Sequence, residues 1–185
     1  MKLRPAQNLL EMMIAIGVIM VTVFGTISLI ISTITASRIS QNRIEATNLA
    51  REGIEAVRSI RDSNWLKRSQ NVKNLAGTIF AWDENLSAGN WYAVFIPTTG
   101  WTLSTSGSTV KINLAPAGYY TQENCGGCVG TKYSRQITIA KSSDTVSIGG
   151  SSKDIYFLDV SVKVSWSDRL GGRSLTAREK LYDWK

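Results

Sequence analysis

Two cysteines are the most reactive side chains of this 185-residue sequence, and they stand together as Cys125-Gly126-Gly127-Cys128. Three states fit this spacing: a small disulfide loop, two free thiols, or a pair of metal ligands. The sequence has no histidine and no second cysteine pair, so a metal site lacks its other usual ligands. A thioredoxin-like motif would begin a helix, whereas this one lies in a loop context. We expect the disulfide loop.

The lack of histidine also limits catalysis. It removes Ser-His and Cys-His nucleophile pairs and the commonest general base. The adjacent carboxylates Asp83 and Glu84 would point to opposite sides of a strand, so they do not form an acid/base pair. No glycine-rich loop of the phosphate-binding type is present. We therefore expect a protein that is not an enzyme and that uses no cofactor and no metal.

Basic residues form the second group that could bind a ligand. The chain has 21 Lys and Arg against 14 Asp and Glu, a net charge of +7. Near the C-terminus, a basic cluster could contact DNA phosphates, with aromatic side chains stacking on bases: Arg169, Arg173, Arg178 and Lys180. The cations are spread over several predicted elements, so a solvated basic surface facing acidic neighbours is the simpler interpretation. DNA or anion contact stays an alternative.

An uncharged apolar run dominates the N-terminal part of the chain. It covers the 26 residues from Met12 to Ser37. As a helix it would be about 39 Å long, which exceeds the ~30 Å hydrocarbon core of a bilayer. Lys2 and Arg4 precede it, so the positive-inside rule places the N-terminus in the cytoplasm and the later residues outside. A cleaved secretory signal would have a shorter apolar region of about 7–15 residues.

Glu11 interrupts the apolar pattern just before this run. An acidic group deep in a lipid-facing helix costs about 2.5–3.5 kcal/mol, and less near the interface. Glu11 therefore either lies solvated at headgroup level or receives a cation from another chain when helices associate.

Helical periodicity continues after Ser37, and no proline occurs between Pro5 and Pro97. An apolar stripe recurs at spacings of 4, 3, 4 and 3: Ala46, Ala50, Gly53, Val57 and Ile60. The opposite face carries alternating charges: Arg51, Glu55, Arg58 and Asp62. The pattern predicts one helix from about Asn8 to Asn64.

The period then changes from 3.6 to 2, which predicts strands. The alternating runs are Val110 to Leu114, Ile137 to Ile139 and Val160 to Trp166, and Trp91 to Ile96 reads as a central strand. Asp168 to Gly172 reads as a hairpin loop, followed by a strand with Leu175, Ala177 and Leu181. Thr98–Thr109 and Ser142–Ser152 are rich in Ser, Thr and Gly and read as surface loops. The sequence predicts an α+β fold in which an antiparallel sheet covers the helix stripe.

The residues Lys2-Leu3-Arg4-Pro5-Ala6, followed by Gln7 to Ile16, resemble the N-terminus of type IV prepilins and type II secretion pseudopilins. The resemblance implies that a prepilin peptidase cuts between Ala6 and Gln7 and that the new amine of Gln7 is methylated. Glu11 is then the fifth residue of the mature chain. The resemblance implies that, during assembly, its carboxylate neutralises the N-terminal amine of Gln7 in a neighbouring subunit. The chain departs from the family in having Ala6 for the usual Gly and Gln7 for the usual Phe or Met.

The resemblance implies a pilin-like organisation: a leader at 1–6, a transmembrane and assembly half-helix at 7–37, an amphipathic half-helix at 38–64, and a β-sheet head at 65–185. Two further stretches loosely resemble minor pilins of the V and I types: Asn48 to Arg58 with Asn64-Trp65, and Leu181 to Trp184.

The function that the resemblance implies is a structural, minor filament subunit. Its partners would be other pilin or pseudopilin subunits in a homo- or hetero-polymer, the prepilin peptidase, an inner-membrane platform with its ATPase, and membrane lipid before assembly. It would reside in the cytoplasmic membrane and then in a cell-surface or periplasmic filament. The alternatives are a DNA-binding or adhesive minor pilin, and an uncleaved single-span anchored domain in which Glu11 is dispensable.

Overall fold

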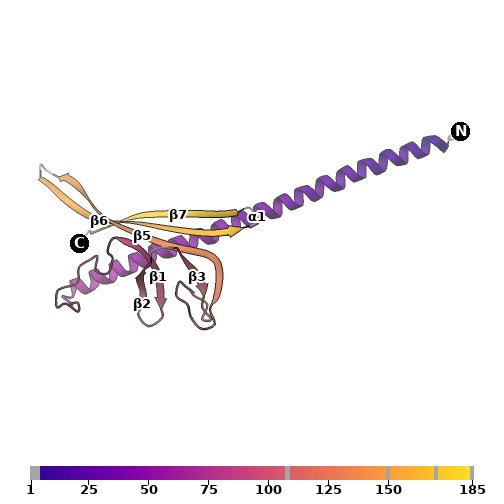
Figure 1. The fold of residues 1–185 in the computed structure, drawn as a ribbon. Helices are drawn as coiled ribbons and strands as arrows, with labels where there is room; N and C mark the ends of the chain where they lie inside the picture. Colours follow the sequence, from indigo (N-terminus) through magenta and orange to yellow (C-terminus); the bar gives the residue numbers. More distant parts are fainter. Residues whose placement is uncertain (1–4, 107–108, 149–150, 169–170, 184–185) are drawn as a thin grey trace. The chain divides into compact units, whose positions relative to one another are not determined.

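A computed structural model describes residues 5–106, 109–148, 151–168 and 171–183 of the chain (Figure 1). One helix, α1 (Pro5–Ser69), comes first. The strands that follow are β1 (Gly89–Ile96), β2 (Gly100–Thr105), β3 (Val110–Leu114), β4 (Tyr120–Thr121), β5 (Val129–Ile148), β6 (Ser151–Asp168) and β7 (Gly171–Tyr182). The chain is therefore α+β, with its helix first and its strands after it, as the change of period predicts.

Among the described residues the seven strands form one antiparallel sheet, and β5 organises it. On one side β5 pairs with β6, which pairs in turn with β7. The other edge of β5 is shared by β3 along residues 129–135 and by β1 along residues 137–139. In the described part of the chain β2 pairs with β1 alone and β4 with β3 alone, so β1 lies between two partners as a central strand does.

The helix spans two compact units of the chain, Met1–Ile44 and Glu45–Lys185. In the second unit it continues past the expected end at Asn64 and stops at Ser69. Trp65 is only 5% exposed and is the last buried apolar residue of the helix, so the helix continues far enough to pack it. Lys67 and Arg68 follow in the last turn, where positive charge complements the helix dipole.

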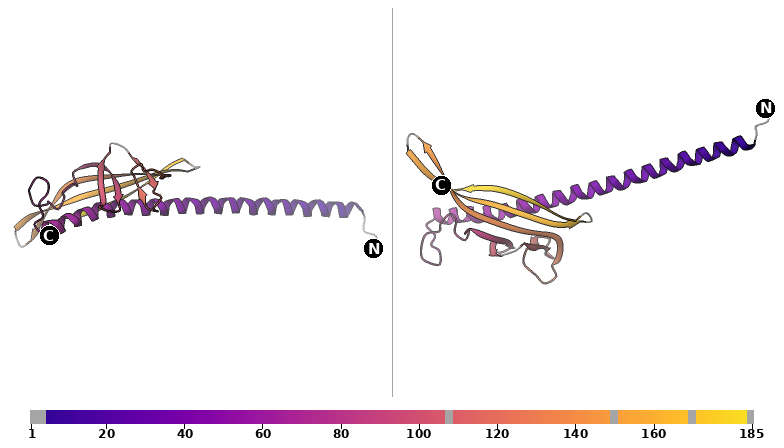
Figure 2. Two further views of the ribbon diagram at one scale, coloured as in Figure 1. Left: turned by 90° about the horizontal axis from the view of Figure 1, so that it is seen from below. Right: turned by 45° about the horizontal axis from the view of Figure 1, so that its top comes forward.

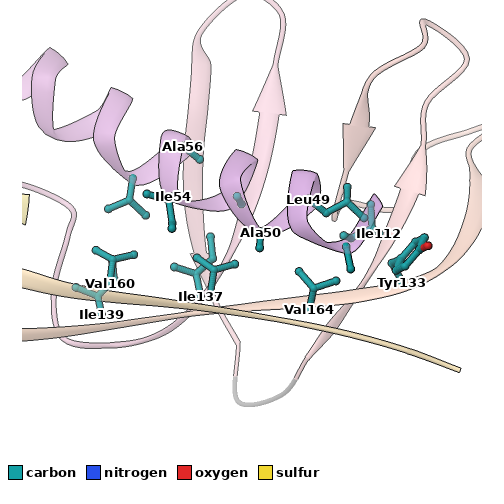
Figure 3. Packing of buried hydrophobic residues seen from close by; sticks show 14 of the residues in the cluster. Leu49, Ala50, Ile54, Ala56, Ile112, Tyr133, Ile137, Ile139, Val160 and Val164 are labelled. Atoms are coloured by element: carbon teal, nitrogen blue, oxygen red, sulfur yellow. The ribbon is translucent and has the colours of Figure 1, made fainter. Parts of the chain in front are cut away.

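The core of the second unit lies between the helix and one face of the sheet. Figure 3 shows Leu49, Ala50 and Ile54 of α1 directed toward the strands. The alternating residues of the sheet meet them and are almost fully buried: Ile137, Ile139, Val160, Val162 and Val164. The predicted helix stripe and the predicted inward faces of the strands are thus two sides of one hydrophobic core.

Gly53 is where the helix approaches the sheet most closely. A Cβ atom at this position would lie 2.9 Å from Cγ1 of Val162 and 3.2 Å from Cδ of Arg135. Real carbon atoms do not come this close, so the helix can sit at this distance only because residue 53 has no side chain.

We expect Gly53→Ala to lower the free energy of unfolding by about 1–3 kcal/mol, because the added methyl group overpacks the core. The helix propensity of alanine would by itself favour the variant by about 0.5–1 kcal/mol. The control is Gly25→Ala, because nothing lies within 4 Å of a Cβ there. Urea unfolding of the chain in detergent measures both. Equal stability of the two variants would contradict the close approach.

Two segments expected to be loops are strands. Ser142–Ser152 belongs largely to the β5–β6 hairpin, whose pairing runs from Tyr133↔Trp166 to Ile148↔Ser151. Thr98–Thr109 contains β2. The far part of the β5–β6 hairpin extends past Tyr182, the last residue of β7 (Figure 2). Its side chains are mostly exposed on both faces, so Ser and Asp occupy strand positions there and hide the alternation that marks a half-buried strand.

Candidate functional site

The first candidate site is the apolar half of α1. In the described residues of the first unit, the large apolar side chains are exposed along the helix, from Leu9 at 64% to Ile34 at 49%. The helix contains an 18-residue window with a mean hydropathy of 2.6, none of which is buried. By length and composition this helix can cross a membrane.

The threonine hydroxyl groups of this segment are satisfied within the helix. Thr22 and Thr33 donate hydrogen bonds to the carbonyl oxygens four residues earlier, at 2.7 and 2.8 Å. Thr35 does the same at 2.8 Å, and Thr26 donates to the carbonyl oxygen of Val23 at 2.9 Å. Hydroxyls bonded in this way do not need water, so the segment presents an almost wholly apolar surface to its surroundings.

Glu11 is the acidic exception on this surface. Its side chain is exposed and makes no hydrogen bond or ion pair within the described residues. The expected cleavage site between Ala6 and Gln7 falls in the first turn of α1, which begins at Pro5. The side chains of Ala6 and Gln7, like Lys2 and Arg4, lie outside what the structure describes. Within the described residues the carboxylate of Glu11 has no partner, so water or another chain can supply one.

The other half of α1 is fastened to the sheet by polar contacts as well as by its core stripe. Among the described residues, four side chains of the helix each form a hydrogen bond with a side chain of β5, of β7 or of the residue after β7, and Arg68 also forms an ion pair with Asp183 at 3.7 Å. The hydrogen-bonded pairs are Glu45–Tyr133 at 2.6 Å, Glu52–Arg135 at 3.1 Å, Arg58–Glu179 at 2.5 Å and Trp65–Asp183 at 3.3 Å. We call these contacts the helix clamps. They recur about every two turns, so they fix both the rotation and the axial position of the helix on the sheet.

Arg135 is the most deeply buried of the clamps, with no exposed surface. Its Nε donates to Oε1 of Gln122 at 2.9 Å, and its Nη1 donates to the carbonyl oxygen of Leu49 at 3.0 Å and to Glu52. Its Nη2 is buried and has no partner among the described residues. Burial lowers the pKa of Arg135, and the carboxylate of Glu52 acts in the opposite direction.

The surroundings of two other clamps raise the pKa of a clamp side chain. Burial raises the pKa of the Tyr133 hydroxyl, and its hydrogen bond to Glu45 adds to the increase. Tyr133 thus stays a neutral donor over the whole physiological range. The hydrogen bond that Arg58 donates to the carboxylate of Glu179 raises the pKa of Arg58, which also pairs with Glu55.

None of the clamp residues was among the candidate functional residues that we predicted from the sequence. A signal existed for one of them, because Arg135 occupies an inward position in the alternation of β5 between Tyr133 and Ile137. A charged residue on the buried face of a strand must find partners. The partners themselves, on α1 and at Gln122, could not be identified from the sequence pattern.

The structure does not gather the C-terminal cations into one site. Arg173 pairs with Asp168 at 3.0 Å, and Lys180 lies 3.4 Å from Asp144 and over the ring of Phe157. Arg178 is exposed and makes no ion pair within the described residues, and Arg169 lies outside them. Strand alternation also places Arg173 on the opposite face of β7 from Arg178 and Lys180.

Cys125 and Cys128 form a disulfide in the loop between β4 and β5. The amide of Cys128 donates to the carbonyl oxygen of Cys125 at 3.1 Å, which closes the turn. Gly127 has a φ of 80°, a value that glycine adopts without strain. Among the described residues no group of three or more His, Cys, Asp and Glu side chains could hold a metal ion.

We expect the double variant Cys125→Ser/Cys128→Ser to lose about 2 kcal/mol of unfolding free energy or less, because so short a loop restricts the unfolded chain little. Urea unfolding of the chain in detergent measures the loss. Reduction of the unmodified chain is the control and should give the same value. A loss of about 4 kcal/mol or more would show that the loop stabilises the sheet directly.

Comparison of the chain with protein-family models, with curated proteins and with solved structures gives no match. Its function therefore has to be inferred from the apolar helix, the sheet and the contacts that join them.

Proposed function

We propose that the chain is a structural subunit, of the minor kind, in a filament of the type IV pilus or type II secretion pseudopilus class. One observation carries the proposal: a single helix, α1, is wholly exposed and apolar in one half and fixed to a sheet by its core stripe and its clamps in the other. The pilin-like N-terminal residues up to Ile16 add independent support from the sequence.

An exposed apolar helix of this length requires an apolar environment that shields its side chains from water. Before assembly that environment is the bilayer, which the segment from Met12 to Ser37 is long enough to span. After assembly it is a bundle of equivalent helices from other subunits, in which the same side chains pack against each other. The absence of unsatisfied threonine hydroxyls suits both environments.

To pass from the bilayer into the helix bundle, the helix and the head have to move together. The helix clamps suit this task, because they couple α1 to β5 and to the β7 end of the sheet at four points. The energy must come from partners, an inner-membrane platform with its ATPase. The subunit would have its N-terminus in the cytoplasm and its head outside, first at the cytoplasmic membrane and then in a surface or periplasmic filament.

Removal of residues 1–6 would create a cationic amine at Gln7, and Glu11 would be the fifth residue of the mature chain. The first turn of α1 would have to open for a peptidase, and helix ends open readily because their terminal amides lack partners. In a helical bundle the amine of one subunit and Glu11 of its neighbour would neutralise each other. Such a pair sets the axial register more than it adds stability.

The experiment is the intact mass of the full chain expressed with and without an active prepilin peptidase. We expect the loss of residues 1–6 only when the peptidase is present, with or without one added methyl group. Glu11→Ala made alongside should still be cleaved, because Glu11 lies beyond the scissile bond. An unchanged mass beside an active peptidase would instead support an uncleaved single-span anchored domain.

A further inference from the structure

A groove of about 680 Å³ lies in the second unit between α1 and the β1–β2 hairpin. The last turns of α1 contribute Ser59, Ser63 and Asn64 to one wall, and the hairpin contributes Trp91, Trp101 and Leu103 to the other. Figure 1 shows β1 and β2 beside this part of the helix. The volume is in the range of sites that hold small organic ligands, about 300–1,000 Å³.

Two indole rings form the apolar side of the groove, and both are held in place. Trp91 and Trp101 are partly buried and pack against the hydrophobic core. The Nε1 of Trp91 donates to the carbonyl oxygen of Ser87 at 3.0 Å, and the ring of Trp101 lies against Phe95 with centroids 5.1 Å apart. Rings that are already fixed lose little conformational entropy when a ligand stacks on them.

The helix wall combines Ile60, the last residue of the core stripe, with exposed polar residues beside it. Ser59 and Ser63 are small hydroxyl residues one turn apart, so they leave open a space that Leu or Ile would fill. Asn64 is 3% exposed, and its Nδ2 donates to the carbonyl oxygens of Glu84 at 2.7 Å and Trp82 at 3.3 Å. Asn85 adds a second amide to the lining, at a φ of 62°.

We propose that this groove binds an uncharged oligosaccharide, with sugar rings stacked on Trp91 and Trp101 and sugar hydroxyls bonded to the side chains of Ser59, Ser63 and Asn85. A pyranose ring has an apolar C–H face and a rim of hydroxyl groups. It therefore matches a groove with fixed indoles on one side and hydroxyl and amide groups on the other. This assignment concerns residues 59–103 only and does not depend on whether the chain polymerises.

The charge of the groove argues against nucleic acid. Lys67 is the one charged side chain among the described residues that line it, and its Nζ lies 4.6 Å from the ring centroid of Phe80. Nucleic-acid binding needs several cations along the phosphate backbone. A lipid chain is also a poor fit, because it would cover the exposed hydroxyl groups of Ser59 and Ser63 and the exposed amide of Asn85 without bonding to them.

The test uses the full chain in a zwitterionic detergent that has no sugar headgroup. Cellotriose, maltotriose and tri-N-acetylchitotriose are titrated separately, with tryptophan fluorescence and calorimetry as readouts. We expect saturable binding of at least one of the three at concentrations up to about 10 mM. Failure of all three to bind would overturn the proposal.

Two variants decide whether such binding occurs in the groove. Ser63→Tyr places a ring in the groove from an exposed helix position, and Asn85→Gly removes an amide while keeping a residue that tolerates this φ. We expect each to weaken binding by about tenfold or more. Ser69→Tyr, an exposed position of the same helix outside the lining, is the matched control and should bind within about twofold of the unmodified chain. Unchanged binding by Ser63→Tyr would overturn the assignment, whatever the filament role of the chain.

Discussion

Replacing Arg135 by alanine is expected to lower the free energy of unfolding by about 3–5 kcal/mol, the largest loss that we expect from a single substitution in the head. The guanidinium is fully buried and bonds Gln122, the carbonyl oxygen of Leu49 and Glu52. Its removal takes a donor from each of these acceptors, leaving Oε1 of Gln122 with only the amide of Ala93 among the described residues, and opens a cavity beside Gly53. Urea unfolding of the chain in detergent, followed by circular dichroism, measures the loss.

The double variant Arg135→Met/Glu52→Gln tests how much of this loss comes from the cavity and from the carboxylate of Glu52 that is left without its cation. Methionine fills much of the same volume, and glutamine removes the carboxylate that would remain uncompensated. We expect the double variant to recover a large part of the stability that Arg135→Ala loses. Arg178→Ala, an exposed arginine of β7, is the control and should change stability by no more than about 0.5 kcal/mol. A small effect of Arg135→Ala would mean that the core stripe alone holds the helix on the sheet.

The elements that follow a single periodic rule could be predicted from the sequence. The stripe from Ala46 to Val57 repeats at helical spacing, and the residues from Val160 to Trp166 alternate, because each faces one continuous core. The same rule explains why Ser142–Ser152 was wrongly predicted to be a loop. Strand residues of the outer β5–β6 hairpin are exposed on both faces, so no alternation distinguishes them from a loop.

The contacts between elements could not be predicted, because they depend on how far apart two surfaces lie in space. Glu52 and Arg135 are 83 positions apart in the chain, and only the packing of β5 on α1 brings them together. The groove has the same origin. Nothing in the sequence pattern marks Ser63 of the helix or Trp101 of the strand, because the groove forms only where the β1–β2 hairpin packs beside the last turns of α1.

The proposed assembly gives the second large effect. Glu11→Ala is expected to leave membrane insertion and cleavage unchanged and to reduce the amount of subunit in filaments by about tenfold or more, equivalent to at least about 1.4 kcal/mol. The carboxylate has no partner within the described part of its own chain, so a second chain can supply one. In the alanine variant, the amine of Gln7 in the neighbouring subunit would enter an apolar bundle without a counter-charge, and such a buried unpaired charge costs about 3–5 kcal/mol.

The measurement is the ratio of subunit in sheared filaments to subunit in membranes, in cells that contain the assembly apparatus. Glu55→Ala is the matched control, because Glu55 is an exposed carboxylate of the same helix in the half that is fixed to the head. It should leave the ratio near that of the unmodified chain. If Glu11→Ala enters filaments as well as Glu55→Ala does, the carboxylate remains solvated at headgroup level in both states. The apolar surface from Met12 to Ser37 would then have to set the axial register by shape alone.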